Sequence, residues 1–208
     1  MGKSATARFF AEAGVPVHDA DAAVHRLYAS EAVPAIEAAF PGSTAPADGA
    51  TSSGSAVVDR EKLGAYVLGD PAAMARLEGI VHPLVRREEV RFLDSAADAG
   101  AAVAVLEIPL LFETGADRRV DAVVVVTAPA DVQRARAFER PGMTEEKFRA
   151  ILARQLPDVE KRRRADFIVD TSQGFDSARA QVHAILLAVP MLPIRRAAMP
   201  DPHSLHGA

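Results

Sequence analysis

Short apolar segments alternate with longer stretches of helical character along the chain. Three of these segments, 101–108, 120–127 and 167–169, are rich in Val and Ile, and a weaker one covers 15–18. Continuous rather than alternating apolarity is typical of strands that helices cover on both faces of a sheet. Strands that alternate with helices favour parallel pairing. The pattern therefore predicts an α/β fold with a parallel sheet.

Several residues mark the ends of the predicted helices. A helix over 4–13 should end at Gly14, a residue suited to a left-handed terminus. Asp70 and Pro71 are typical of a helix start, and Thr144 precedes acidic residues that favour another. The segment 41–55 is dense in small residues and Pro, so we expect an exposed loop there.

The composition excludes several classes of protein. Of the 208 residues, 49% are hydrophobic and 25% charged, so the chain should fold as a globular protein. The 24 basic and 28 acidic side chains give a net charge of −4, so we expect neither nucleic acid nor a membrane as partner. The sequence has no Cys, which excludes disulfides and thiol catalysis. Without an export signal, we expect the protein in the cytoplasm.

The first residues carry the clearest chemical signal. Gly2, Lys3 and Ser4 form the second half of the phosphate-binding pattern G-x-x-x-x-G-K-[ST]. In that pattern the glycine lets the backbone approach a phosphate, the lysine contacts the β and γ groups, and the serine hydroxyl can ligate Mg²⁺. With Ala5, these residues form a candidate cofactor-binding segment. The alternative is an ordinary capped helix.

The first half of this pattern does not precede Gly2 in the sequence. A central strand of about five buried residues, which normally comes before the pattern, contributes around 10 kcal/mol. That is comparable with the ~5 to 15 kcal/mol stability of a whole domain. We therefore expect the natural polypeptide to begin upstream, with Met1 as an internal methionine.

Further segments accompany this opening in a specific order. They are Asp19-Ala20-Asp21 with His25; His82-Pro83 with Arg86; an apolar strand over 103–108 that runs into Pro109-Leu110-Leu111-Phe112-Glu113; and Gln155, a basic run and Ala165 to Asp170. With the opening tripeptide, they resemble the dephospho-CoA kinase family from Met1 to about Val189.

The resemblance implies a three-layer fold like that of P-loop NTPases, as one domain over 1–189. A helical acceptor-binding region would cover about 59–99 and a lid about 130–156, and we expect a disordered Pro-rich tail over 190–208. The implied activity is the last step of coenzyme A synthesis, in which ATP, with Mg²⁺, phosphorylates the ribose 3'-hydroxyl of dephospho-CoA.

The aspartate pair is the candidate catalytic centre. Phosphoryl transfer to a hydroxyl needs a carboxylate that accepts the hydroxyl proton. In an extended segment Asp19 and Asp21 would share a face at the crevice that borders a parallel sheet. We assign Asp21 as the base and Asp19 as a metal ligand through water or a substrate-positioning residue. The opposite assignment stays open, as does helix capping by Asp19.

By resemblance, the substrate-binding residues are Asp19, His82, Arg86, Pro109, Leu110, Leu111, Phe112 and Glu113. A guanidinium at Arg86 could grip the phosphates of dephospho-CoA. The structural alternatives are a helix end at His82-Pro83 and core positions for the apolar residues before Glu113.

The remaining candidates lie on the nucleotide side. The resemblance assigns Arg136, Arg140 and Thr171 to ATP, and Thr171 stands where the family usually has Asn. Arg140 precedes a Pro-Gly turn that could swing it onto the phosphates, so we group it with Lys3 as catalytic. The basic run 161–164 predicts a surface turn near ATP, since only 5% of residues are aromatic and could stack on bases. His203 and His206 in the tail are expected to have no role.

Ser4 and Asp19 are the expected metal ligands, and the chain should be a monomer or a weak homo-oligomer. Two rival functions stay open at this point. One is a kinase for another small-molecule hydroxyl. The other is a catalytically impaired relative that binds CoA-like ligands or a protein partner.

Overall fold

The computed structural model describes residues 2–47 and 56–192, and the chain divides into two compact units. The mixed unit combines Met1–Val17 with Glu107–Ala208, and the helical unit is His18–Leu106. Each unit is described by itself below. Among the helices of the described ranges, none combines the length and the apolarity needed to cross a membrane.

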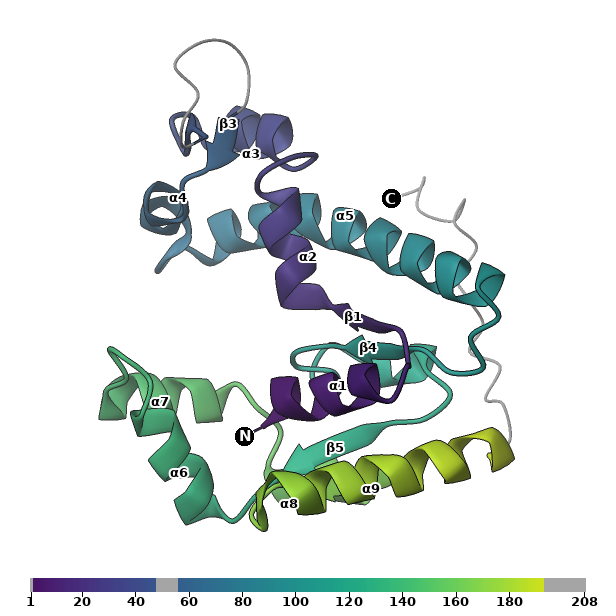
Figure 1. The fold of residues 1–208 in the computed structure, drawn as a ribbon. Helices are drawn as coiled ribbons and strands as arrows, with labels where there is room; N and C mark the ends of the chain where they lie inside the picture. The colour runs from purple at the N-terminus through teal and green to yellow at the C-terminus, as the bar shows by residue number, and fades with distance from the viewer. Residues whose placement is uncertain (1, 48–55, 193–208) are drawn as a thin grey trace. The chain divides into compact units, whose positions relative to one another are not determined.

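The mixed unit holds a parallel strand pair. Its elements are α1 (Lys3–Glu12), η1 (Ala116–Arg119), β5 (Val124–Thr127), α6 (Ala130–Phe138), α7 (Glu145–Ala153), α8 (Asp158–Arg164), β6 (Phe167–Asp170), α9 (Gly174–Ala188) and η2 (Val189–Met191) (Figure 1). β5 and β6 run parallel, from Val124 opposite Phe167 to Thr127 opposite Asp170. The predicted parallel pairing is therefore confirmed.

The helical unit is built from α2 (Ala20–Leu27), α3 (Val33–Ala39), β2 (Thr44–Pro46), β3 (Ala56–Val58), α4 (Arg60–Val67) and α5 (Pro71–Asp98) (Figure 1). β1 (Val17–Asp19) and β4 (Val105–Glu107) pair where the chain passes from one unit to the other. The core of the helical unit joins all four of its helices to β3, and its buried members are Leu27, Ala32, Val33, Ile36, Phe40, Val58, Leu63, Val67, Leu77, Val81 and Leu84.

The long helix α5 begins where it was predicted to begin but continues beyond His82-Pro83, where the sequence suggested that it could end. The Asp70 carboxylate accepts hydrogen bonds from the amides of Ala72 and Ala73, which satisfies two donors of the first turn. Pro83 lies inside this 28-residue helix, so a helix end at His82-Pro83 is wrong. Pro83 and Gly79, four residues earlier, are both exposed, so water can reach the carbonyl that the proline leaves without its donor.

Other boundaries differ from the predictions for physical reasons. The apolar segments 101–108 and 120–127 form strands only in their last part, because apolarity signals burial as well as pairing. The expected loop 41–55 contains β2, which pairs antiparallel with β3, while 48–55 lie outside the described residues. The Glu37 carboxylate supports β2 by accepting hydrogen bonds from the Gly42 amide and the Thr44 hydroxyl.

Two further segments were predicted differently. The basic run 161–164 forms the last turn of α8 rather than a surface turn, because acidic residues open this helix and basic ones close it, in line with its dipole. The stretch 130–156 is two helices, α6 and α7, with a break between them. Of the predicted tail, 193–208 lie outside the described residues.

A buried histidine lies where β1 enters the helical unit. His18 is 6% exposed and packs on Phe92 with 5.3 Å between the ring centroids. Its Nε2 has no hydrogen-bond partner within the described part of the chain. Burial lowers the pKa of His18, and Arg26 acts in the same direction, while the nearby carboxylates of Glu89, Glu88 and Asp19 act against it. His18 therefore stays neutral in the folded protein near pH 7.

This lowered pKa predicts a loss of stability on acidification. The unfolded chain binds the His18 proton near pH 6.5, and the folded chain binds it only at lower pH. The free energy of unfolding should therefore fall as the pH drops below about 6.5, by at most about 1.4 kcal/mol per pH unit from this group. Urea unfolding between about pH 5 and 7 measures this effect. The free energy of unfolding should depend less steeply on pH for His18→Gln than for the exposed control His82→Gln. Equal profiles for the two variants would contradict this role of His18.

Candidate functional site

The start of α1 is a helix N-terminus without a side-chain cap. Gly2 occupies the cap position with φ 88°, in the left-handed region, and its carbonyl accepts the Thr6 amide at 2.8 Å. No side chain of the described residues caps the first amides of this 10-residue helix. Free amides and the positive end of the helix dipole together favour an anion at this position.

One buried carboxylate organises the residues that follow Gly2. The same oxygen of Glu107, Oε1, lies 3.3 Å from Lys3 Nζ and accepts a hydrogen bond from Ser4 Oγ at 3.0 Å. Glu107 is 8% exposed at the end of β4, whereas the Lys3 side chain is 42% exposed. A lone acid at the end of an apolar strand is the signal from which this residue could have been found. Glu107 was not among the site residues predicted from the sequence.

Three residues predicted to bind the cofactor meet at the carboxyl end of β6. Both terminal nitrogens of the Arg136 guanidinium donate to Thr171, one to its hydroxyl and one to its carbonyl, each at 2.9 Å. The Thr171 hydroxyl also lies 3.1 Å from the Thr127 carbonyl, which ties it to β5. A Cβ added to Gly2 would lie 3.0 Å from Thr171 Cγ2, so the glycine is needed for this close approach.

Arg140 lies in the connection between α6 and α7. Its side chain is exposed and makes no ion pair or hydrogen bond with any other described residue. The two helices are held together by Arg134, which pairs with Glu145 at 2.8 Å and lies over the rings of Phe138 and Phe148. Arg140 is therefore a free guanidinium on a helix pair that has its own internal contacts.

The segment after β4 is a tight turn of the mixed unit. Leu110 has φ 52° and is 41% exposed, and its carbonyl accepts the Thr114 amide and hydroxyl. Phe112 is buried against Val123 and Val125, so it occupies the core position that the sequence left as an alternative. The Glu113 carboxylate accepts the Leu156 amide at 2.5 Å and lies 4.0 Å from Lys161 Nζ. Pro109 is exposed and Leu111 packs at the edge of the same core.

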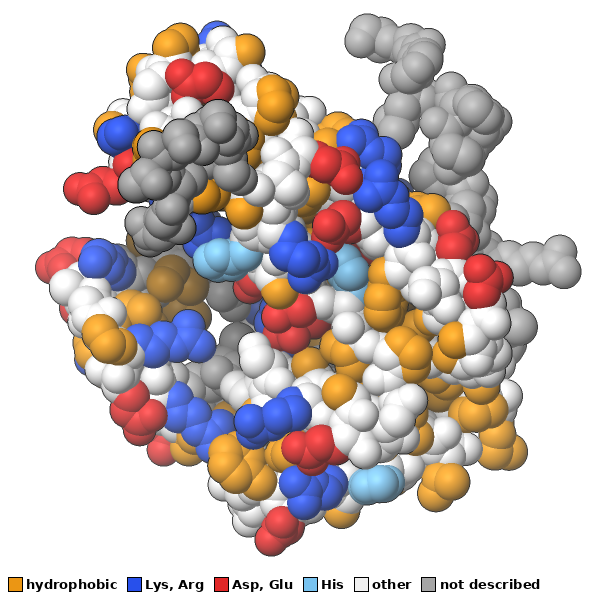
Figure 2. All heavy atoms as spheres, turned by 45° about the horizontal axis from the view of Figure 1, so that its top comes forward, with side chains coloured by type: hydrophobic (Ala, Val, Ile, Leu, Met, Phe, Trp, Pro, Cys, Tyr) orange, Lys and Arg blue, Asp and Glu red, His pale blue; other side chains and the backbone are white. Residues whose placement is uncertain are grey.

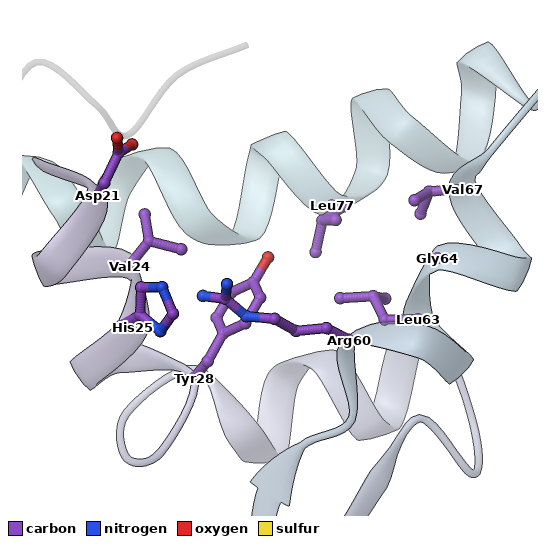
Figure 3. A pocket seen from close by; sticks show the side chains of 9 residues that line it. All are labelled: Asp21, Val24, His25, Tyr28, Arg60, Leu63, Gly64, Val67 and Leu77. Atoms are coloured by element: carbon purple, nitrogen blue, oxygen red, sulfur yellow. The ribbon is translucent and has the colours of Figure 1, made fainter. Parts of the chain in front are cut away.

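The two aspartates lie in the helical unit and have different environments. β1 ends at Asp19 and α2 begins at Ala20, so the expectation of a shared face in an extended segment is wrong. The Asp19 carboxylate caps α2 by accepting the Ala22 amide at 3.0 Å. The Asp21 carboxylate is exposed at the rim of a pocket, as Figure 3 shows. Asp21, rather than Asp19, is thus free to meet a substrate.

The pocket beside Asp21 has a volume of about 550 Å³ and lies between α2, α4 and α5 (Figure 3). Its lining residues are Asp21, Val24, His25, Tyr28, Arg60, Leu63, Gly64, Val67 and Leu77. His82 and Arg86 are on α5 but do not line it. His82 is exposed, and Arg86 donates to the buried carboxylate of Glu89 at 2.7 Å. The structure therefore separates these two predicted substrate residues from the pocket.

The donor groups at α1 have the chemistry of a magnesium site. Mg²⁺ prefers oxygen ligands and commonly uses one or two carboxylates with substrate phosphates and water. The Ser4 hydroxyl and the Glu107 carboxylate supply such oxygens side by side. The described residues contain no group of three or more His, Cys, Asp or Glu that could hold a metal by itself. Asp19 belongs to the helical unit, so its predicted part in a metal site stays a prediction.

The surface charge is mixed where it can be seen. On the face shown in Figure 2, Lys and Arg side chains are interspersed with Asp and Glu. Several cations of the basic helix α8 are paired: Arg163 with Glu160 at 3.0 Å, and Arg164 with Asp117 at 2.7 Å. Pairing of this kind weakens the field that a phosphate backbone would need.

Comparison with known proteins shows to which family the chain belongs. A sequence model described as dephospho-CoA kinase matches residues 1–177. The chain belongs to the dephospho-CoA kinase family. It is 60% identical over 196 residues to a dephospho-CoA kinase of Rhodopseudomonas palustris, with 94% of each chain covered. It is 63% identical over 186 residues to one of Mesorhizobium japonicum, with 89% of this chain and 90% of the relative covered.

Two solved structures share the fold of this chain. The crystal structure of TT1252 from Thermus thermophilus matches with a TM-score of 0.73 and 31% identity, over 90% of this chain and 91% of that one. A dephospho-CoA kinase from Campylobacter jejuni shares the fold, with a TM-score of 0.64 at 24% identity over 91% and 92% of the two chains. The α/β fold with parallel strands that the sequence predicted is therefore confirmed.

Two alanine substitutions distinguish the effect of the close contact between Gly2 and Thr171 from the effect of backbone strain. Gly2 and Gly14 both have positive φ, but a Cβ at Gly14 would meet nothing within 4 Å. Each substitution by Ala should cost roughly 1 to 2 kcal/mol of stability through strain. Gly2→Ala should in addition displace Thr171 and weaken ATP binding about tenfold, a free-energy change of about 1.4 kcal/mol. Isothermal titration with ATP measures this, and equal ATP affinity in the two variants would refute the close-approach role.

Proposed function

We propose that this protein transfers the γ-phosphoryl group of ATP to the ribose 3'-hydroxyl of dephospho-CoA, which gives coenzyme A and ADP. The observation that carries the proposal is the cluster of Lys3, Ser4 and Glu107 at the open N-terminus of α1. The membership of the dephospho-CoA kinase family supports the choice of acceptor. The 3'-oxygen forms a bond to the γ-phosphorus while the bond from that phosphorus to the bridging oxygen breaks, and its electrons leave with ADP.

On the nucleotide side, each residue of the α1 terminus has a role that its position supports. The amides that follow Gly2 bind phosphate oxygens, and Lys3 neutralises charge on the β and γ groups. Arg136 and Thr171 border the same terminus and contact the nucleotide beside it. Arg140 is unpaired among the described residues and so can move onto the transferred group when α6 and α7 close as a lid.

Ser4 and Glu107 would hold Mg²⁺ in this reaction. When bound, the ion offsets the negative charge that the β and γ phosphates accumulate. The fit rests on the two adjacent oxygen donors. In its absence Glu107 pairs with Lys3, so the carboxylate keeps the lysine near the phosphate position.

On the acceptor side, Asp21 receives the proton of the 3'-hydroxyl. Its exposure at the rim of the pocket supports this role, because a general base must reach the hydroxyl directly. Asp19 acts as a positioning residue, since its carboxylate fixes the first turn of α2 that carries Asp21. The acceptor-binding region about 59–99 contributes α4 and α5 to the pocket.

We further propose that the reaction takes place in the cytoplasm, with the chain as a monomer or a weak homo-oligomer. The absence of Cys from the sequence is compatible with a reducing compartment. Each unit has its own buried apolar cluster, which supports a fold that needs no partner chain.

The acceptor is tested by single-turnover phosphorylation of a panel of hydroxyl compounds with labelled ATP. Dephospho-CoA should be phosphorylated at least about 100-fold faster than nucleosides or sugar acids, a difference of about 2.7 kcal/mol in transition-state binding. Coenzyme A, whose 3'-oxygen is already phosphorylated, is the matched control and should give no product. Faster phosphorylation of a nucleoside or sugar acid would overturn the assignment.

The base is tested by Asp21→Asn, which keeps the size of the side chain but cannot accept the proton. The turnover number should fall by a factor of about 10² to 10⁴, while the affinity for ATP stays the same. Asp98→Asn, at the far end of α5 and exposed, is the control and should keep full turnover. If Asp21→Asn turns over at a near-normal rate, the base is another group.

A further inference from the structure

The pocket of the helical unit is ordered by chemistry from one end to the other. Figure 3 shows Asp21 at one rim, the side chains of His25, Tyr28 and Arg60 next to one another, and Leu63, Val67 and Leu77 at the opposite end. From one end of the pocket to the other, the lining is therefore first a carboxylate, then a group of polar aromatic and cationic side chains, and finally an apolar wall. Its volume of about 550 Å³ is in the range of sites for small molecules.

Arg60 is the cation of this pocket, and it lacks an acidic partner. Its guanidinium carbon lies 5.4 Å from the centre of the Tyr28 ring, and no described carboxylate forms an ion pair with it. Two other arginines of the same unit are paired, Arg26 with Glu88 and Arg86 with Glu89, each at 2.7 Å. A guanidinium left free in a pocket is available to an anionic ligand.

Arg60 opens a helix whose first amides a neighbouring carboxylate caps. Arg60 is the first residue of α4, where the positive end of the helix dipole repels a cation. The adjacent acid, Asp59, does not offset this repulsion through a contact with Arg60. Its carboxylate accepts the amides of Glu61 and Lys62, and it lies 3.5 Å from Lys62 Nζ. The amides of the first turn are thus already capped, and the donors left free at this end of α4 are those of the guanidinium.

Tyr28 adds a hydrogen-bond donor to the same place. Figure 3 shows its hydroxyl directed into the pocket, and no described residue accepts or donates a hydrogen bond there. Burial raises the pKa of Tyr28, while Arg60 acts in the opposite direction, so the hydroxyl keeps its proton at neutral pH. A protonated phenol and a guanidinium together suit the oxygens of a diphosphate.

We propose that Arg60, assisted by the Tyr28 hydroxyl, binds the 5'-diphosphate of dephospho-CoA, and that the wall of Leu63, Val67 and Leu77 takes the pantetheine arm. The inference rests on the proposed function, because it starts from a ribose 3'-hydroxyl at Asp21. From that ribose the acceptor continues into a diphosphate and then into an uncharged arm that contains methyl and methylene groups. This order matches the carboxylate, the cation and the apolar wall of the pocket.

The assignment moves the phosphate-binding role from Arg86 to Arg60. Arg86 does not line the pocket, and its guanidinium is held by the buried carboxylate of Glu89. A diphosphate there would have to compete with this buried carboxylate for the guanidinium. At Arg60 no such competition exists among the described residues.

Steady-state kinetics of the full-length chain test the proposal. Arg60→Ala should raise the KM for dephospho-CoA about 10- to 100-fold, the range expected for lost charge-assisted hydrogen bonds, with the KM for ATP unchanged. Arg60→Lys should fall between the wild type and Arg60→Ala, because a point charge replaces the guanidinium fork. The control Arg76→Ala removes an exposed arginine of α5 outside the pocket and should leave both KM values unchanged.

The outcomes separate this inference from the proposed function. If the wild type phosphorylates dephospho-CoA and Arg60→Ala behaves like Arg76→Ala, the assignment of Arg60 is wrong and the proposed function stands. A rise in the KM for ATP as large as that for dephospho-CoA would also overturn it, since it would indicate general damage. If the wild type does not phosphorylate dephospho-CoA, the proposed function and the inference both fail.

Discussion

The buried carboxylate of Glu107 determines how the start of α1 is arranged. An ionised carboxylate at 8% exposure is costly unless charged or hydrogen-bonding partners compensate it, and Lys3 and Ser4 are those partners. The same contact fixes the lysine ammonium and the serine hydroxyl beside amides that no described side chain caps. A single acid at the end of a strand thereby assembles a positive charge, an oxygen pair and a helix terminus, which are the parts that a triphosphate with its metal ion requires.

Much of the fold follows from local patterns in the sequence. The Asp70 cap of α5, the Thr144 cap of α7 and the parallel direction of the buried strands were all predicted, because caps and buried strands depend on neighbouring residues and on apolarity. The predictions were wrong where contacts between residues distant in the sequence, or the exposure of a helix face, determine the local structure. β2 exists because β3 pairs with it from beyond a long connection, and Pro83 is tolerated inside α5 because its face is exposed.

The candidate site shows the same division. Gly2, Arg136 and Thr171 were predicted from a motif and a resemblance, and the structure brings them together at the end of β6. Glu107 and Arg60 were not predicted, because each derives its significance from what lies beside it in space: a lysine about a hundred positions away for one, and the lack of an acidic partner for the other. Arg86 is the opposite case. The resemblance predicted it as a substrate-binding residue, but its guanidinium pairs with a carboxylate one helical turn away.

The account depends most directly on whether Glu107 acts on the nucleotide through a metal ion. The decisive measurement is the ATP affinity of the wild type and of Glu107→Gln, titrated once with Mg²⁺ and once with a chelator. We predict that Glu107→Gln weakens ATP binding about tenfold or more with Mg²⁺ and leaves it equal or tighter with the chelator, because a negative charge next to the phosphates is removed. Equal affinity of the two proteins in the presence of Mg²⁺ would contradict the account.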